Sequence, residues 1–211
     1  MLVLGGARGG KSGFADQLAA DLAANRGSGV TYIATSETND VEMAARVAAH
    51  RAARPAAWTT IECPRAVPAA IRAHATGNAL FLLDCVTFWV SNLILTGDAF
   101  GGAHPGDDFN YDKSLLSAQQ ERAAADRVST AVDDLLAALA ETGATLIAVS
   151  NEVGLGVVPE YPLARLYRDQ LGRANQRLAA AADQVYLLVA GLPLDLKALA
   201  TSPLSTKEPG S

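Results

Sequence analysis

The chain has 211 residues, half of them hydrophobic, and its 17 basic and 22 acidic side chains give a net charge of −5. This composition is typical of a globular domain with a buried core, and so acidic a chain is not expected to coat duplex nucleic acid. No stretch approaches the about twenty consecutive apolar residues of a membrane span, and Cys63 and Cys85 are expected to be buried reduced thiols. We therefore expect a cytoplasmic protein whose ligand is a small phosphorylated molecule.

The first dozen residues contain the most specific motif. The apolar run Met1–Leu4 precedes Gly5–Ser12, which matches the P-loop pattern G-x-x-x-x-G-K-S. Glycines let backbone N–H groups surround a phosphate, and the next helix directs its N-terminus at the same anion. Lys11 would reach the β- and γ-phosphates, and Ser12 would bind Mg²⁺. The alternative is a glycine-rich turn that matches the pattern by chance. The predicted strand before the motif and the predicted helix after it argue against this alternative. The predicted nucleotide site therefore includes Gly5, Gly6, Ala7, Arg8, Gly9, Gly10, Lys11 and Ser12.

Strand and helix patterns alternate along the rest of the chain. A strand, a helix and a second strand within residues 1–35 predict a parallel sheet, and such sheets bind ligands at the carboxyl ends of their strands. The expected fold class is therefore α/β. Strands are predicted at 2–4, 30–34, 57–63 (as an edge strand), 79–84, 144–149 and 184–189. Helices are predicted directly after the P-loop and at 40–55, 67–75, 87–95, 114–141 and 163–182.

Polar residues follow several of these predicted strands. Thr35 and Ser36 follow the second strand, and Asp84 ends an apolar run in the manner of a Walker B strand, whose carboxylate holds Mg²⁺ directly or through water. An apolar run ending in Asp is weak evidence alone, but the P-loop strengthens it. The segment 153–160, which cannot be regular helix, is expected to form a loop over the nucleotide.

Two groups of cationic residues lie on predicted helices. His50, Arg51 and Arg54 crowd the last turn of the helix at 40–55, and the residues alone leave a solvated helix end and a functional cluster equally open. A second cluster, which includes Arg168 and Arg173, is either a solvated face or a binding site for phosphate or carboxylate. The polar segment 97–112 reads as a lid or an unordered loop.

The ordered motifs resemble those of one family, the bifunctional adenosylcobinamide kinase / adenosylcobinamide-phosphate guanylyltransferases of cobalamin biosynthesis. The resemblance extends from about residue 2 to residue 197, and the number of motifs in the same order makes it specific. It implies a RecA-like P-loop NTPase fold with a mostly parallel sheet flanked by helices. One domain is expected over residues 1–197, with a disordered tail over 198–211. The matching segments are 5–12, 32–35, 40–46, 50–55, 82–87, 150–156 and 168–176.

The resemblance implies two reactions on one chain. A nucleoside triphosphate, ATP or GTP, phosphorylates the aminopropanol hydroxyl of adenosylcobinamide, and GMP from GTP is then transferred to adenosylcobinamide phosphate, which gives adenosylcobinamide-GDP. His50 matches the histidine that becomes guanylylated, and a neutral imidazole is a competent nucleophile near pH 7. Arg46, Arg51 and Arg54 would neutralise the α-phosphate. A homotrimer is also implied.

The expected site is catalytic at His50 and Lys11 and binds Mg²⁺ through Ser12 and Asp84. Gly9 departs from the family, whose members commonly have Ser there, and tolerance is expected because the loop works through backbone N–H groups. No general base for the kinase step is evident, and Glu62 and Asp84 are open candidates. Further nucleotide contacts are expected from Thr35, Ser36, Arg51, Arg54, Glu62 and Asp84.

Three rival functions remain. A different small-molecule P-loop kinase would use His50 only to position a phosphate. A nucleotide-dependent switch would need a guanine-reading motif, and the Asn-Lys-x-Asp pattern does not occur in the chain. A transferase that has lost the kinase activity would act only on the phosphorylated corrinoid.

Overall fold

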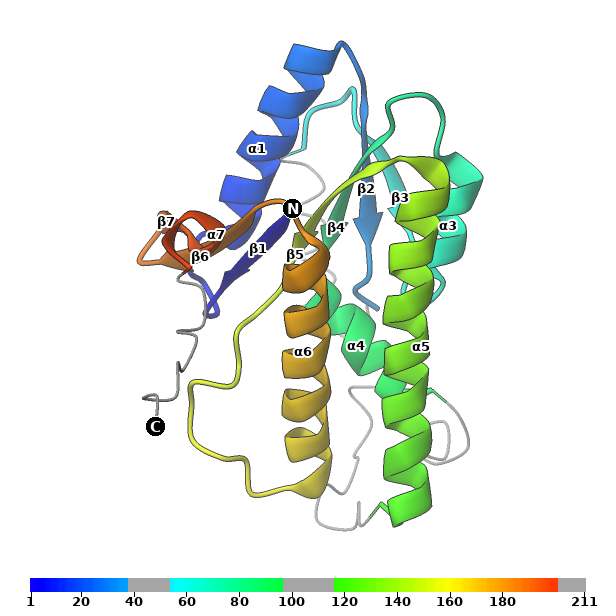
Figure 1. Ribbon diagram of the computed structural model, residues 1–211, viewed down its shortest axis with the longest axis vertical. Helices are drawn as coiled ribbons and strands as arrows, with labels where there is room; N and C mark the ends of the chain where they lie inside the picture. Colours follow the sequence, from blue (N-terminus) through cyan, green and yellow to red (C-terminus); the bar gives the residue numbers. More distant parts are fainter. Residues whose placement is uncertain (38–53, 97–115, 201–211) are drawn as a thin grey trace, which may run out of the picture.

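The computed structural model describes residues 1–37, 54–96 and 116–200 (Figure 1). The predicted helix at 40–55 falls almost wholly outside these ranges, as do the segment 97–112 and the tail from residue 201. The strands are β1 (Leu2–Gly5), β2 (Val30–Ala34), β3 (Thr59–Glu62), β4 (Leu80–Asp84), β5 (Thr145–Val149), β6 (Val185–Val189) and β7 (Leu192–Asp195). The helices are α1 (Lys11–Arg26), α3 (Val67–His74), α4 (Val86–Leu95), α5 (Ala118–Thr142), α6 (Pro162–Ala181) and α7 (Leu196–Leu199).

All the described strands belong to one sheet with the order β3-β2-β4-β5-β1-β6-β7. The pairings are parallel except that of β6 with β7. The strand that carries the P-loop, β1, is separated by β5 from β4, the strand that ends in Asp84. The predicted fold class is therefore confirmed, and β3 lies at the sheet edge as expected.

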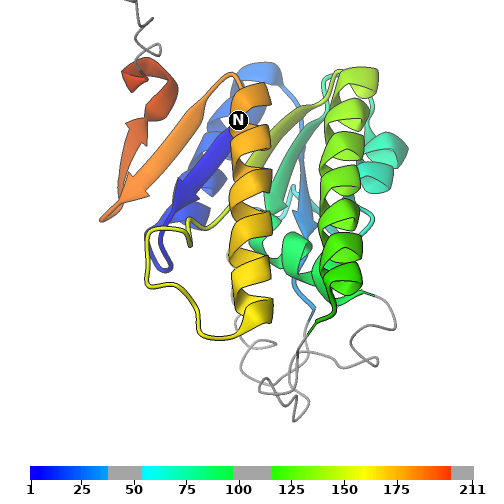
Figure 2. The same cartoon turned by 60° about the horizontal axis from the view of Figure 1, so that its bottom comes forward.

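Helices cover the two faces of the sheet unequally (Figures 1 and 2). On one face lies α1, whose buried Ala15 and Ala19 pack with Val3 and with other residues of the sheet. The small alanine side chains bring the backbone of α1 close to the sheet, including β1, the strand that precedes the P-loop. The other face is covered by α3, α4, α5 and α6, and Leu2 and Leu4 belong to that larger core. Because successive strand residues point to opposite faces, β1 serves both cores.

The long helices α5 and α6 each bury an apolar stripe. Val128, Val132 and Leu135 are buried along α5, and Leu171 is among the buried residues of α6. A capping box at Ser117 starts α5 and satisfies backbone N–H groups at its first turn. These two helices lie side by side and fix the far wall of the large core (Figure 2).

The sequence analysis missed the last two elements. A two-residue turn at Ala190 (φ 52°) and Gly191 (φ 81°) folds the chain back into β7, and positive φ at both positions suits the twist of a hairpin. Pro193 is tolerated because β7 is an edge strand. The Asp195 carboxylate then accepts hydrogen bonds from the N–H groups of Lys197 and Ala198 and starts α7. The expected domain end at residue 197 therefore falls inside a helix.

Both cysteines are buried and free, as predicted. Within the described residues, no helix combines the length and the apolar character that crossing a bilayer requires.

Candidate active site

The P-loop connects β1 to α1 at the carboxyl edge of the sheet. Gly10 has φ 87° and immediately precedes α1, a left-handed conformation that glycine adopts without strain. The Gly9 N–H donates to the Gly6 carbonyl at 3.2 Å, which closes the loop on itself. These contacts shape a turn whose N–H groups and helix N-terminus suit a bound phosphate.

Lys11 is nearly buried, with 9% of its surface exposed, and its Nζ donates to the Gly6 carbonyl at 2.6 Å. Burial lowers the pKa of Lys11, and the nearby Cys85 and Asp84 oppose that shift. A desolvated ammonium held by a single backbone carbonyl can exchange that carbonyl for phosphate oxygens, whose charge it would neutralise more fully. Lys11 is thus positioned within the cradle that the motif predicted.

Asp84 lies at the end of β4, in register with Ala34 of β2 and Val149 of β5. The hydroxyl of Tyr32 donates to Asp84 Oδ2 at 2.8 Å. Burial, followed by the Asp84 charge, raises the pKa of Tyr32 well above its usual range, so the phenol stays protonated and remains a donor. This hydrogen bond orients one carboxylate oxygen and leaves the other for a ligand.

The Arg54 guanidinium stacks on the Tyr32 ring, with its Cζ 3.3 Å from the ring centroid, and Nη1 donates to Thr60 Oγ1 at 3.2 Å. A guanidinium over an aromatic face gains cation–π stabilisation while its edge stays available to anions. Tyr32 therefore connects Arg54 on one side with Asp84 on the other.

These groups line one cavity of about 390 Å³, called here the nucleotide cavity. Within the described residues, the cavity brings part of the predicted site together: four P-loop residues, Ser36, Arg54 and Asp84. Positive groups dominate this lining, which favours a polyphosphate. The lining residues are Ala7, Arg8, Lys11, Ser12, Tyr32, Ala34, Ser36, Arg54, Asp84, Cys85, Phe88, Val149 and Asn151.

Thr35 was predicted beside Ser36 but takes a different position. It is fully buried, its hydroxyl donates to the Cys85 carbonyl at 2.7 Å, and it accepts from the Cys85 N–H at 2.8 Å. The Asn92 amide donates to the Thr35 carbonyl at 2.8 Å. The Thr35 hydroxyl therefore both donates to and accepts from the backbone of Cys85. Through these two hydrogen bonds, Thr35 connects the end of β2 to the end of β4 behind the cavity wall.

Four other predicted residues lie apart from the nucleotide cavity or outside the described ranges. Glu62 ends β3 and is exposed, and it does not line the cavity. Arg46, His50 and Arg51 lie outside the described residues.

Ser12 and Asp84 meet the first requirement for a magnesium site, since both line the nucleotide cavity. A hydroxyl and a carboxylate are hard oxygen ligands, and Mg²⁺ at nucleotide sites is completed by phosphate oxygens and water. No group of three or more His, Cys, Asp or Glu residues that could hold a metal occurs in the described part of the chain. The residues present therefore fit a nucleotide-bound Mg²⁺ and not a closed protein cage.

Sequence reasoning missed Tyr32, Asn151 and Cys85 as parts of this cavity. A signal was available for Tyr32, an aromatic residue with a hydroxyl two residues before the end of a mostly apolar strand. Burial raises the pKa of Cys85 to about 12, with a further contribution from Asp84, so this thiol stays protonated and unreactive near neutral pH.

Comparison with known proteins agrees with this geometry. The family model described as cobinamide kinase / cobinamide phosphate guanyltransferase matches residues 1–196. The chain is 43% identical over 197 residues to the bifunctional adenosylcobalamin biosynthesis protein CobU of Salmonella typhimurium, covering 93% of this chain and 99% of that protein. It is 41% identical to the CobU protein of Escherichia coli, with the same coverage. It is 40% identical to the CobP protein of Pseudomonas aeruginosa over 93% of this chain and 96% of that protein.

Proposed function

Because the chain belongs to the cobinamide kinase / cobinamide phosphate guanyltransferase family, we propose that its nucleotide cavity serves both activities and that His50 carries GMP between them. The observation that supports one shared cavity is the convergence of Lys11, Arg54 and Asp84 on a single space of about 390 Å³. The substrates are GTP or ATP, adenosylcobinamide and adenosylcobinamide phosphate.

In the kinase reaction, the acceptor hydroxyl oxygen attacks the γ-phosphorus, and the bond from that phosphorus to the β,γ-bridging oxygen breaks. The nucleoside diphosphate leaves, and the hydroxyl proton passes to a base or to water. Lys11 and the P-loop N–H groups hold the β- and γ-phosphates and stabilise the charge that develops on them. Ser12 and Asp84 would hold Mg²⁺, which supplies further charge neutralisation at the phosphate oxygens.

In the guanylyl transfer, an imidazole nitrogen of His50 attacks the α-phosphorus of GTP, a P–N bond forms and pyrophosphate leaves. An oxygen of adenosylcobinamide phosphate then attacks the same phosphorus, the P–N bond breaks and the imidazole is released. The position of Arg54 supports this role for His50. Arg54 lines the nucleotide cavity, and His50 stands only four residues before Arg54 in the sequence.

The test of the covalent intermediate uses GTP labelled at the α-phosphorus. Incubation with Mg²⁺ and without corrinoid should leave an acid-labile, alkali-stable label on the protein, and His50→Ala should abolish it. His74→Ala is the matched control, because His74 is an exposed histidine of α3 whose Nδ1 contacts the Ala70 carbonyl. Label on another side chain, or γ-phosphate transfer without any covalent GMP, would refute the intermediate and favour a simple kinase.

We also propose a homotrimer. Its support here is the exposure of large apolar side chains on the edge hairpin, where Val189, Leu192 and Leu194 are 53%, 68% and 43% exposed. Exposed apolar clusters on one edge favour contact with another protein surface. Sedimentation equilibrium that gives a monomer at micromolar concentration would contradict the assembly.

A further inference from the structure

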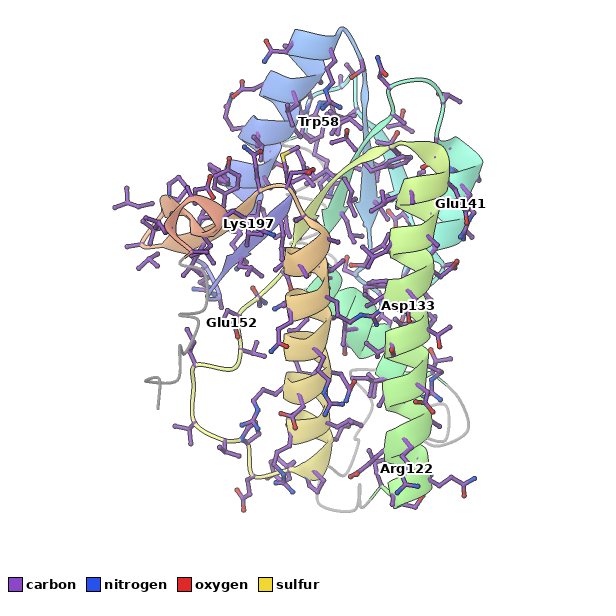
Figure 3. All side chains as sticks on the ribbon, viewed as in Figure 1. Trp58, Arg122, Asp133, Glu141, Glu152 and Lys197 are labelled. Carbon is purple, nitrogen blue, oxygen red and sulfur yellow. The ribbon has the colours of Figure 1, made fainter. Side chains whose placement is uncertain are left out.

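A second cavity, called here the α6 cavity, lies between α6 and the loop that leaves β5. Its volume is about 480 Å³, and its lining includes Leu4, Glu152, Arg168, Asp169, Arg173 and Gln176. Figure 1 shows the loop leaving the lower edge of the sheet and passing beside α6 before the helix begins, and Figure 3 labels Glu152 on it.

The two cavities share this loop as a wall. Asn151 lines the nucleotide cavity, and its neighbour Glu152 lines the α6 cavity. The Glu152 N–H donates to the carbonyl of Gly5, the first residue of the P-loop motif, at 3.1 Å. A ligand in the α6 cavity would therefore lie directly across the loop from the triphosphate.

The polar groups of the α6 cavity are balanced between donors and acceptors. Two guanidinium groups and two carboxylates line the cavity, so their formal charges cancel. Arg168 donates to Asp169 at 3.0 Å, and Glu152 accepts from the Gly154 N–H at 2.9 Å. Arg173 makes no hydrogen bond or ion pair with any other residue in the described ranges and is available to a ligand. A neutral lining of this kind favours uncharged polar groups such as carboxamides over a second polyphosphate.

The same loop also exposes apolar side chains next to this cavity. Leu155, Val157 and Val158 are 87%, 94% and 61% exposed, and they directly follow Gly154 of the cavity wall. Such exposure of neighbouring large apolar residues marks a binding surface. An apolar surface beside a pocket of amide-binding groups fits a flat apolar ring with carboxamide side chains at its edge.

We propose that the α6 cavity and the apolar segment 155–158 bind the corrinoid acceptor. A carboxamide side chain of the macrocycle enters the cavity and accepts from Arg173, and the ring rests on Leu155 and Val157. The cavity is too small for the whole macrocycle, which stays at its open mouth. This inference rests on the proposed function, because it assigns the second substrate of the same reactions.

The test is equilibrium binding of cobinamide, followed by the absorbance of the corrin in dialysis, together with steady-state kinetics for cobinamide and GTP. Arg173→Gln should raise the Kd for cobinamide about tenfold, since it removes a charged hydrogen-bond donor, and should leave the KM for GTP within about twofold. Leu155→Ser tests the apolar segment independently and should weaken cobinamide binding several-fold. Arg122→Gln, which makes the same charge change at an exposed position of α5, should alter neither value.

Cobinamide affinity within about twofold of the unmodified protein in both variants would overturn the inference, as would an equal loss of GTP affinity. A failure of the α6 cavity assignment is distinguished from a failure of the proposed function by measuring whether the unmodified protein converts cobinamide and GTP to product. If the unmodified protein forms the guanylylated product while both variants bind cobinamide normally, only the assignment of the α6 cavity is wrong. If the unmodified protein forms no product from cobinamide and GTP, both the proposed function and the assignment of the α6 cavity are wrong.

Discussion

The hydrogen bond from Tyr32 to Asp84 allows a sharp test of the proposed magnesium site. Tyr32→Phe removes one hydroxyl and keeps the aromatic ring on which Arg54 stacks. The lost contact is a 2.8 Å hydrogen bond to a carboxylate, and Tyr32 is 3% exposed. Hydrogen bonds to charged groups contribute about 1.5–3 kcal/mol. Because Asp84 is only half-buried and can recruit water, we expect the free energy of unfolding to fall by about 1.5 kcal/mol, the lower end of that range.

The functional effect should appear in the Mg²⁺ dependence. Removing a group that orients a metal ligand commonly costs about 10–100-fold in metal affinity, so Tyr32→Phe should raise the Mg²⁺ concentration for half-maximal guanylylation about tenfold. Mn²⁺ binding to the GTP complex, measured by electron paramagnetic resonance, gives a readout independent of turnover. Tyr186→Phe is the matched control, because Tyr186 packs edge-on against Phe14, with ring centroids 5.1 Å apart, in the same core.

Alkaline unfolding provides a second measurement on the same variant. The pKa of Tyr32 in the folded state is raised by burial and by Asp84, whereas an unfolded tyrosine titrates near about pH 10. Above about pH 10 the unfolded chain loses this proton first, so the unfolding free energy falls by up to about 1.4 kcal/mol per pH unit. The Tyr32→Phe protein should lose less unfolding free energy per pH unit above about pH 10, because it has no phenol to titrate at this position. Wild-type Mg²⁺ dependence together with a wild-type alkaline slope would refute the assigned geometry.

Substitutions at two further positions test the support behind the wall of the nucleotide cavity and the P-loop. Thr35→Val should lower the unfolding free energy by about 2 kcal/mol, because it orphans the buried Cys85 N–H, while Thr35→Ser should stay within about 1 kcal/mol of the unmodified protein. Urea unfolding with parallel GTP titration measures both, and a Thr35→Val protein of normal stability that binds GTP poorly would instead make Thr35 a direct ligand. Gly9→Ser places a Cβ 3.0 Å from the Gly6 carbonyl oxygen, so we expect the loop to shift slightly and GTP affinity to fall less than about fivefold. Loss of GTP binding would show that the loop cannot adjust.

Most of the fold could be predicted because apolar periodicity and turn residues agree along the chain. Buried parallel strands such as β4 read as continuous apolar runs, and long amphipathic helices such as α5 keep a regular stripe. The hairpin to β7 was missed for two local reasons. Its strand is four residues long and contains Pro193, which usually argues against a strand, and its pairing depends on an edge position that only the assembled sheet reveals.

The site was predictable where a motif fixes the backbone and unpredictable where side chains from distant strands meet. Lys11, Ser12 and Asp84 follow from local patterns, whereas the contact between Tyr32 and Asp84 joins residues 52 positions apart. That contact requires β2 to pair directly with β4, and the sequence gives strand order only weakly. The α6 cavity is a similar case, because its arginines are recognisable but the loop that completes the wall comes from a different part of the chain.

Thr35 and Ser36 show why neighbouring polar residues at a strand end should not be assigned one role. Successive residues of an extended segment point to opposite sides. If Ser36 faces the nucleotide cavity, the adjacent Thr35 must face the interior, where an unpaired hydroxyl would be costly. The Cys85 backbone satisfies that hydroxyl, and Asn92 satisfies the Thr35 carbonyl. Thr35, the buried member of the pair, thus holds β2 against β4, and this keeps Tyr32 within reach of Asp84 at the cavity that Ser36 lines.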